Sequence, residues 1–362
     1  MTTTNNSAPL YNFGAGPACL PQAVLAQIRE DIPNWYEGMS IMEISHRLPV
    51  VMKLTEKIEA NLRTLLAIPE EFAVLFMHGG ARTQFSAVPL NLLNGAAEAD
   101  YIVTGHWSNL ALKDASAYCK AECVASTSEG QFTSLPSHYR FTEASPYIHY
   151  TDNETIHGVE FATPPEADKW LVSDMTSNIL TKSLDFSRYG LIYASAQKNL
   201  GIAGITVVIV RKSLLGKAHP FTPPTLNYEL CFQNHSMINT PPVFSWYVLG
   251  LVVDWALQMG GLTAITKQVA EKAKLLYELI DASDFYHNPV AIEARSRINI
   301  PFRLPSEMQE SLFLAEAEKN GLKQLKGHKV VGGCRASFYN AMPIEGVKAL
   351  VDFMRYFEKA HG

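Results

Sequence analysis

The chain has 362 residues, of which 47% are hydrophobic and 18% charged, a composition typical of compact globular proteins. The formal net charge is -5 and no run of lysine or arginine is present, which argues against a nucleic-acid-binding protein. The five cysteines are scattered, and their spacing fits neither a disulfide framework nor a zinc site, so we expect a cytoplasmic protein with no metal site. The length predicts two domains.

The first 210 residues predict helices and strands that follow one another along the chain. Residues 1–7 are polar, lack the apolar stretch of a secretory signal and predict a loose tail. Apolar residues at helical spacing predict helices over residues 21–32, 50–66, 83–93 and 109–120. Short apolar runs predict strands over residues 72–77, 100–103, 170–172, 191–194 and 206–210. Strands that alternate with helices predict an α/β fold with a mostly parallel sheet flanked by helices.

The remainder of the chain predicts a second unit. Residues 220–242 are rich in proline and polar side chains and predict an extended loop. A helical stretch over 243–282 follows, with a break at Gly260-Gly261; its apolar part is too short for a membrane span and predicts a buried helix. Beyond it, a smaller α+β domain is predicted from strands over 297–302 and 336–340 and helices over 306–320 and 344–359. We expect an N-terminal segment over 1–15 that joins the small domain, a large domain over 16–260 and a small domain over 261–362.

Lys198 and Asp174 are the first candidates for catalytic residues. Each lies just past a predicted strand, in Ser195-Ala196-Gln197-Lys198 and Ser173-Asp174. Pyridoxal phosphate needs an amine to hold its aldehyde and a carboxylate to keep its ring nitrogen protonated. Taken alone, the two residues also fit core strands with polar ends.

Other strand ends add candidates for the same edge. The turn His78-Gly79-Gly80-Ala81-Arg82 links a strand to a helix, where backbone N–H groups favour an anion. Trp107 follows another strand and offers a flat platform for a ring, although most tryptophans are core residues. Because ligands of open parallel sheets bind beyond the carboxyl ends of the strands, one edge is predicted to hold a phosphate site, a stacking ring, an acid and a lysine.

Cationic residues elsewhere suggest a substrate with two anionic ends. His46-Arg47, His328-Lys329 and Arg335 are compact positive centres, and arginine donates two parallel hydrogen bonds to a carboxylate or phosphate. Ordinary surface charges are the alternative explanation.

Several motifs in order resemble the phosphoserine aminotransferase family of fold-type I pyridoxal-phosphate enzymes, from Tyr11 to Gly362. The most specific are Asn12-Phe13-Gly14-Ala15-Gly16-Pro17, Met42-Glu43-Ile44-Ser45-His46-Arg47, Ser195-Ala196-Gln197-Lys198-Asn199 and Arg335-Ala336-Ser337-Phe338-Tyr339-Asn340-Ala341 with Glu345-Gly346-Val347. The resemblance implies a pyridoxal 5'-phosphate enzyme with a large domain built on a mostly parallel sheet and a smaller C-terminal α+β domain.

The resemblance also implies a role for each matching residue. Lys198 forms the Schiff base with the cofactor and Asp174 pairs with its ring nitrogen. The remaining cofactor contacts are Ala81, Arg82, Trp107, Thr155 and Gln197, with Asn239 and Thr240 from the neighbouring subunit of a homodimer with a shared active site. The substrate contacts are Arg335 for the α-carboxylate and His46, Arg47, His328 and Lys329 for the distal phosphate or carboxylate.

The implied reaction is a transamination between L-glutamate and a phosphorylated 2-oxo acid, 3-phosphohydroxypyruvate, which yields O-phospho-L-serine; 4-phosphohydroxy-L-threonine is a further implied substrate. The chain departs from the family at Lys329, where many members have arginine, and at Ala15, where some have serine.

Two alternatives stay open. Another fold-type I enzyme, such as an alanine–glyoxylate type transaminase or a cysteine desulfurase, fits less well, because no cysteine stands out as a mobile nucleophile and the distal cations suit a charged substrate. The second alternative is a non-catalytic nucleotide-binding or interaction protein on a doubly wound sheet.

Overall fold

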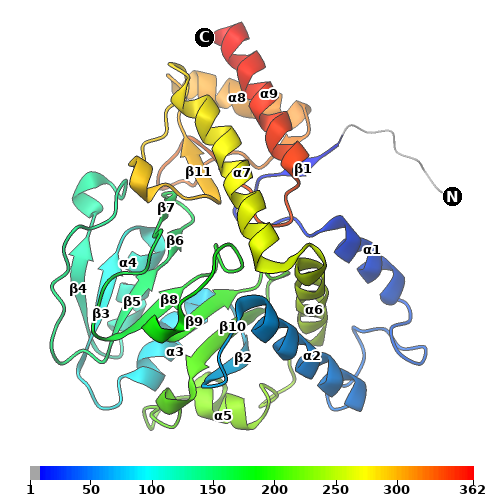
Figure 1. Cartoon of the computed structure of the whole chain (residues 1–362), viewed down its shortest axis with the longest axis vertical. Helices are drawn as coiled ribbons and strands as arrows, with labels where there is room; N and C mark the ends of the chain where they lie inside the picture. The colour runs from blue at the N-terminus through cyan, green and yellow to red at the C-terminus, as the bar shows by residue number, and fades with distance from the viewer. Residues whose placement is uncertain (1–8) are drawn as a thin grey trace.

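A seven-stranded sheet forms the central layer of the computed structural model, which describes residues 9–362 (Figure 1). The predicted tail over residues 1–7 lies outside the described residues. The strand order is β2-β10-β9-β8-β5-β3-β4. The strands are β2 (Phe72–His78), β3 (Glu98–Val103), β4 (Lys120–Ser126), β5 (Tyr147–Thr151), β8 (Trp170–Asp174), β9 (Tyr189–Ser195) and β10 (Ile205–Arg211).

All strands of this sheet run in one direction except β10, which pairs antiparallel with both β2 and β9. The prediction of a mostly parallel α/β sheet is therefore confirmed. The other six strands place their carboxyl ends at one edge. Ile205, the first residue of β10, lies opposite His78 at this edge, so the reversed strand begins where its neighbours end.

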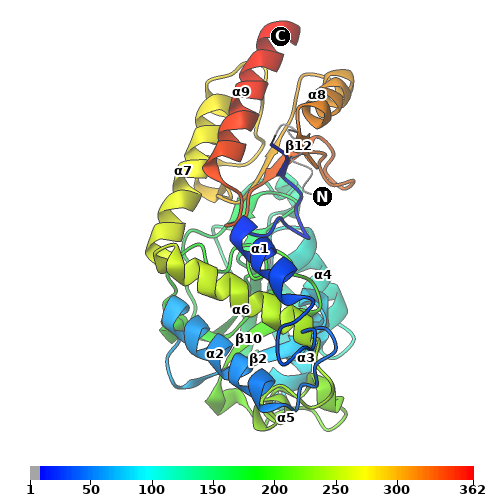
Figure 2. The same cartoon turned by 90° about the vertical axis from the view of Figure 1, so that its right-hand side faces the viewer.

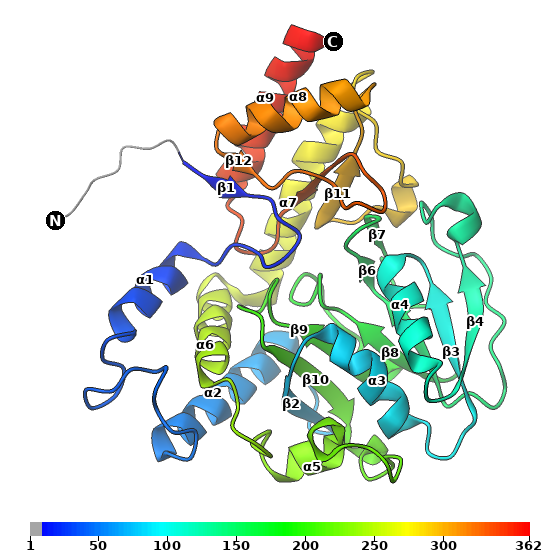
Figure 3. The same ribbon diagram turned by 180° about the vertical axis from the view of Figure 1, so that it is seen from behind.

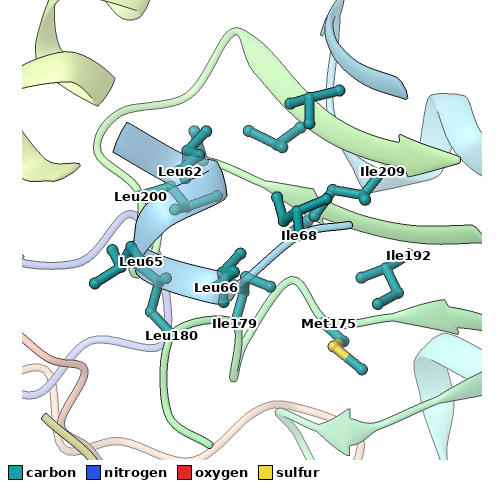
Figure 4. Close-up of a cluster of buried hydrophobic side chains, with 14 of the residues drawn as sticks. Leu62, Leu65, Leu66, Ile68, Met175, Ile179, Leu180, Ile192, Leu200 and Ile209 are labelled. Carbon is teal, nitrogen blue, oxygen red and sulfur yellow. The ribbon is translucent and has the colours of Figure 1, made fainter. Parts of the chain in front are cut away.

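Helices cover both faces of the sheet. One face packs against α2 (Pro49–Leu66) and α6 (Val243–Gln258), and Figure 4 shows Leu62 and Leu66 of α2 in one buried cluster with Ile192 and Ile209 of the sheet. The other face packs against α3 (Ala81–Leu92), α4 (His106–Ala115) and α5 (Tyr228–Gln233). A separate helix, α1 (Gln22–Asp31), contacts α6. The prediction of an extended loop over residues 220–242 was wrong at α5, where the Asn227 side chain caps a short helix whose Cys231 is buried.

Two glycines break the long helical stretch as predicted. Gly260 and Gly261 have φ of 95° and 68°, a left-handed conformation that glycine adopts without strain. The chain bends by 84° between α6 and α7 (Gly261–Asp281). Figure 2 shows the two helices on either side of this bend. Within residues 9–362 no single helix is long and apolar enough to span a membrane, although this bent pair meets the criterion when its helices are taken together. Most residues of α6 are buried, as predicted.

The C-terminal part and α7 together form a separate hydrophobic core. In it, β11 (Asn299–Phe302) pairs antiparallel with β13 (Cys334–Ser337), and α8 (Glu307–Lys319) and α9 (Ile344–His361) pack through their phenylalanines. The N-terminal strand β1 (Tyr11–Asn12) pairs with β12 (Leu322–Lys323), far along the chain. The boundaries at residues 15 and 260 remain predictions.

Candidate active site

A cavity of about 500 Å³ opens at the carboxyl edge of the sheet. Another surface cavity is larger, at about 620 Å³, so the chemistry of the lining rather than its size singles out this one. The predicted site residues that line it are Ala81, Arg82, Trp107, Thr155, Asp174, Gln197, Lys198, His328 and Arg335. The structure thus brings together residues from six separate segments of the chain.

Lys198 lies in the turn after β9, with its amine inside the cavity. Its Nζ donates a hydrogen bond to Oγ1 of Thr155 at 2.6 Å. Burial lowers the pKa of Lys198 to about 8, although the charge of Asp174 acts in the opposite direction. The amine is therefore neutral, and so nucleophilic, at a much lower pH than an exposed lysine. Gly16 allows the close approach, because a Cβ there would lie 3.3 Å from the Lys198 Cε.

Asp174 is the last residue of β8 and is buried. Its Oδ1 accepts a hydrogen bond from the backbone N–H of Thr176 at 2.9 Å. Burial raises the pKa of Asp174, while the hydrogen bonds from Thr176 and the charge of Lys198 act against that rise. A buried carboxylate beside one amine is suited to hold a proton on a ring nitrogen placed against it.

The glycine turn forms a cup for an anion at the start of α3. Gly79 has φ of 92°, and a Cβ there would lie 2.4 Å from Oγ1 of Thr83, so glycine is required. Gly80, Ala81 and Arg82 line the cavity where the first N–H groups of α3 lack intrahelical partners. The Arg82 side chain points to α4, where its Nε lies 2.9 Å from Asp114.

Arg335 and His328 also line the cavity, and both side chains can donate hydrogen bonds to an anion. Arg335 is buried at the start of β13; its Nη1 donates to the Thr155 carbonyl at 3.3 Å, and its Nε has no partner within the described residues. His328 also lines the cavity, and burial lowers its pKa, as do the charges of His106, Arg335 and Lys329. The two residues can bind the two ends of a dianionic substrate.

Five predicted residues do not line the cavity: His46, Arg47, Asn239, Thr240 and Lys329. His46 is buried, whereas Arg47, Asn239, Thr240 and Lys329 are exposed. Their roles stay predictions.

The cavity also contains residues that were not predicted from the sequence. They are Thr151, Asn153, Ile156, Thr176 and Ser177, whereas Gly80 belongs to the predicted glycine turn and Ala15 and Gly16 to a family motif named above. Thr151 ends β5, a strand that was not predicted, and Asn153 lies two residues further on. Recognition of the run Tyr147–Thr151 as a strand would have placed both at the sheet edge.

Comparison with known proteins identifies the family. The sequence matches the family "Aminotransferase class-V" over residues 10–350. The chain belongs to the class-V aminotransferase family. It is therefore an enzyme that transfers amino groups, and the alternative of a non-catalytic nucleotide-binding protein is excluded. Pyridoxal phosphate is the cofactor that this membership implies, as predicted.

Individual relatives agree over nearly the whole length of this aminotransferase. A phosphoserine aminotransferase from Acinetobacter baylyi is 50% identical over 356 residues, which cover 97% of this chain and 99% of that protein. The structure of phosphoserine aminotransferase from Bacillus circulans subsp. alkalophilus has a TM-score of 0.95 at 41% identity, covering 98% of this chain and 99% of that one. A structure of pyridoxal-phosphate-bound phosphoserine aminotransferase from Trichomonas vaginalis has a TM-score of 0.93 at 38% identity, covering 96% and 100%. The predicted resemblance and fold type are confirmed.

The residues of the cavity fit pyridoxal phosphate. The cup at α3 suits the phosphate, Lys198 the aldehyde and Asp174 the ring nitrogen. The indole Nε1 of Trp107 and Oγ1 of Thr151 are buried and have no hydrogen-bond partner within the described residues, so the cavity contains polar groups that a polar ligand can satisfy.

Proposed function

We propose that the aminotransferase converts L-glutamate and 3-phosphohydroxypyruvate to 2-oxoglutarate and O-phospho-L-serine, with pyridoxal 5'-phosphate as cofactor. The observation that carries this proposal is the placement of two hydrogen-bond donors for anions in one cavity, the cation Arg335 and the imidazole of His328, with Lys198 in the same lining. Both amino donors, glutamate and phosphoserine, have an α-carboxylate and a second anion at the far end. The names of the most similar relatives support the same substrate.

The residues of the chain take defined parts in this reaction. When bound, pyridoxal phosphate supplies a carbonyl that receives the amino group and a ring that withdraws electrons from the substrate Cα. Lys198 Nζ takes the proton from Cα, and its pKa of about 8 suits a base that works near neutral pH. Asp174 holds the proton on the ring nitrogen, and Trp107 covers one face of the ring and keeps water from it. Ala81, Arg82 and Gln197 bind the cofactor phosphate.

Thr155 is placed to control the lysine. Its hydroxyl receives the hydrogen bond of Lys198 Nζ, and its carbonyl receives the hydrogen bond of Arg335. One residue thus holds both the proposed base and the proposed carboxylate-binding arginine, which fixes the substrate Cα within reach of the amine.

The test of this proposal is product formation by the purified enzyme. With L-glutamate and 3-phosphohydroxypyruvate we expect 2-oxoglutarate and O-phospho-L-serine in equal amounts, measured by mass spectrometry. Absence of both products, with turnover of L-alanine and glyoxylate instead, would support the alternative transaminase.

Substitution of Arg335 with methionine is expected to weaken the binding of both amino donors, glutamate and phosphoserine. The side chain is buried, so methionine preserves volume while it removes the charge-assisted hydrogen bonds to the α-carboxylate. We expect kcat/KM to fall by about 100-fold or more for glutamate and for phosphoserine alike. Arg355→Met, at an arginine of α9 that is 67% exposed, is the matched control. A loss for one donor alone would contradict a shared carboxylate site.

The same cavity is also proposed to accept 4-phosphohydroxy-L-threonine. Like phosphoserine, this compound has an α-carboxylate and a distal phosphate, so Arg335 and His328 can bind the two ends in the same way. In the same product-formation assay, we expect the enzyme to transfer the amino group of this compound to 2-oxoglutarate.

We further propose a homodimer in which each chain completes the site of the other. His46, Arg47, Asn239 and Thr240 match family residues of the cofactor and substrate sites, yet none lines the cavity that contains Lys198. A second copy can supply them, with Asn239 and Thr240 at the cofactor phosphate and His46 and Arg47 at the distal anion. Lys329 is proposed to act there with His328.

Mixed dimers test this arrangement. Lys198→Ala and Arg47→Ala chains are each expected to be inactive or weakly active alone. If Arg47 serves the partner's site, half of the randomly paired dimers are mixed and have one complete site of two, so about a quarter of wild-type activity returns. No return of activity above the two separate variants would show that Arg47 serves its own chain.

A cytoplasmic location is the last part of the proposal. All five cysteines are free, which suits a reducing compartment. Cell fractionation with an antibody to the native protein tests it.

A further inference from the structure

Glu154 is a buried carboxylate that binds the first turn of α4. Its side chain is 0% exposed. Its Oε2 accepts a hydrogen bond from the backbone N–H of Trp107 at 3.1 Å. Its Oε1 accepts from the backbone N–H and the hydroxyl of Ser108 at 2.8 and 2.7 Å. The negative charge therefore lies at the positive end of the α4 dipole, where it is stabilised.

The local sequence of α4 makes this distant carboxylate necessary. The N-cap residue is Gly105, which has no side chain with which to cap the helix. The Ser108 hydroxyl accepts hydrogen bonds from the N–H groups of Thr104 and Gly105 at 2.9 and 3.1 Å, which leaves its own hydrogen for Glu154. A Cβ at position 105 would lie 2.4 Å from the carboxyl carbon of Glu154, so this approach requires glycine.

The short strand that contains Glu154 connects α4 to Lys198. Glu154 is the second residue of β6 (Asn153–Glu154), and the next residue, Thr155, accepts the hydrogen bond from Lys198. Figure 3 shows β6 beside α4, below β11 of the C-terminal part. Asn153 donates to Asn299 of β11 at 2.8 Å and so fixes the strand from the other side. Adjacent residues therefore hold the start of α4 and the lysine amine.

The indole of Trp107 depends on this support. Its Nε1 has no hydrogen-bond partner within the described residues, so the orientation of the ring is set by the α4 backbone and by van der Waals packing. The one bond from Glu154 to the Trp107 N–H therefore acts at the base of the side chain that is to cover the cofactor.

We propose that Glu154 is a positioning residue that fixes the start of α4, so that the indole of Trp107 stacks on the cofactor ring held at Lys198. This inference rests on the proposed function, because that function places the ring in this cavity. It also assigns the two helix N-termini different anions: α4 receives Glu154, and α3 is left for the cofactor phosphate.

The ionised form of Glu154 is the one that matches its partners. All three groups donate hydrogen bonds, so both carboxyl oxygens must accept. Burial raises the pKa of Glu154, and the hydrogen bonds from Ser108 and Trp107 act against that rise. An amide of the same shape would keep Oε1 on Ser108 but turn an NH₂ donor toward the N–H of Trp107, where two donors repel each other.

The substitution Glu154→Gln tests this single contact. We expect the dissociation constant of pyridoxal 5'-phosphate, measured by absorbance titration of the apoenzyme without substrate, to rise about tenfold. In a Trp107→Ala background the same substitution should change the constant by less than about twofold, because its effect passes through the indole. Glu278→Gln, at an exposed glutamate of α7, is the matched control and should leave the constant unchanged.

Equal effects of Glu154→Gln in the two backgrounds would overturn the proposal, as would an unchanged dissociation constant in the single variant. If Glu154→Gln fails to fold, as judged by near-ultraviolet circular dichroism, Ser108→Ala replaces it in the same cycle. It removes one of the three hydrogen bonds to Glu154, together with the two that the hydroxyl accepts from Thr104 and Gly105, and should weaken cofactor binding about threefold only when Trp107 is present. Because cofactor binding is measured without substrate, a failure here is distinct from a failure of the proposed reaction.

Discussion

Substitution of Lys198 with alanine is expected to lower the rate of transamination by at least about 10,000-fold, because one amine both holds the cofactor and moves the Cα proton. The side chain donates its hydrogen bond to Thr155 within the cavity, so its removal leaves the cofactor cup at α3 and the acid Asp174 in place. The variant should still bind pyridoxal phosphate through its phosphate. Single-turnover measurement with glutamate gives the rate directly.

The control for this loss is Lys274→Ala, at a lysine of α7 that is 72% exposed and pairs with Glu278. It should keep the wild-type rate. Borohydride reduction followed by peptide mapping should label Lys198 in the native enzyme and no lysine in the Lys198→Ala variant. Transamination at a normal rate without Lys198 would show that the lysine is not the base.

Substitution of Asp174 with asparagine is expected to lower kcat by about 100- to 1000-fold with a smaller change in KM. Asparagine has the same shape but no charge, so the ring nitrogen loses the partner that keeps it protonated, and the ring withdraws electrons from Cα less strongly. Steady-state kinetics with glutamate measure both constants.

A second consequence follows for Lys198. The charge of Asp174 raises the pKa of the amine, against the larger effect of burial. In Asp174→Asn the amine should therefore lose its proton at a lower pH than in the native enzyme. Asp352→Asn, at a carboxylate that is 75% exposed on α9, is the control and should behave as wild type. An unchanged kcat in Asp174→Asn would show that the charge of Asp174 is not needed for the reaction.

Long apolar runs allowed most of the sheet to be predicted, but they do not encode direction or mark every strand. The run over Ile205–Arg211 was predicted as a strand, yet an apolar run reads alike in both directions, and its reversal appears only in the pairing with β2 and β9. The edge strand β4, Lys120–Ser126, is half-exposed and charged, so it lacks an apolar run and was not predicted as a strand; the helix predicted over 109–120 extended to its first residue.

The strand β5 was not predicted because its sequence contains polar residues. In β5, Tyr147–Thr151, all five residues are buried, including His149, whose Nε2 lies 2.8 Å from the hydroxyl of Tyr193. Buried tyrosine and histidine are tolerated because they are paired across strands, and such pairing cannot be read from a single segment. Because this strand was not predicted, Asn153 and Glu154, which follow it, were not placed at the edge of the sheet.

The site could be predicted wherever a residue follows a strand directly. Asp174 and Lys198 are of this kind, and the shared edge of the sheet brings them into one cavity. Residues that act through tertiary contacts gave no such signal: Glu154 supports Trp107 from a segment 47 positions away in the chain. His46 and Arg47 lie outside the cavity, so their assignment depends on the resemblance and on the proposed second copy.

The most direct test of the account is the ratio of kcat/KM for O-phospho-L-serine to that for L-serine, with 2-oxoglutarate as the amino acceptor. The two donors differ only in the distal phosphate. If His328 and its cationic partners bind that group, we expect the phosphorylated donor to be preferred by about 1000-fold or more. Equal values for the two donors would contradict the assignment of a distal anion site and, with it, the proposed substrate.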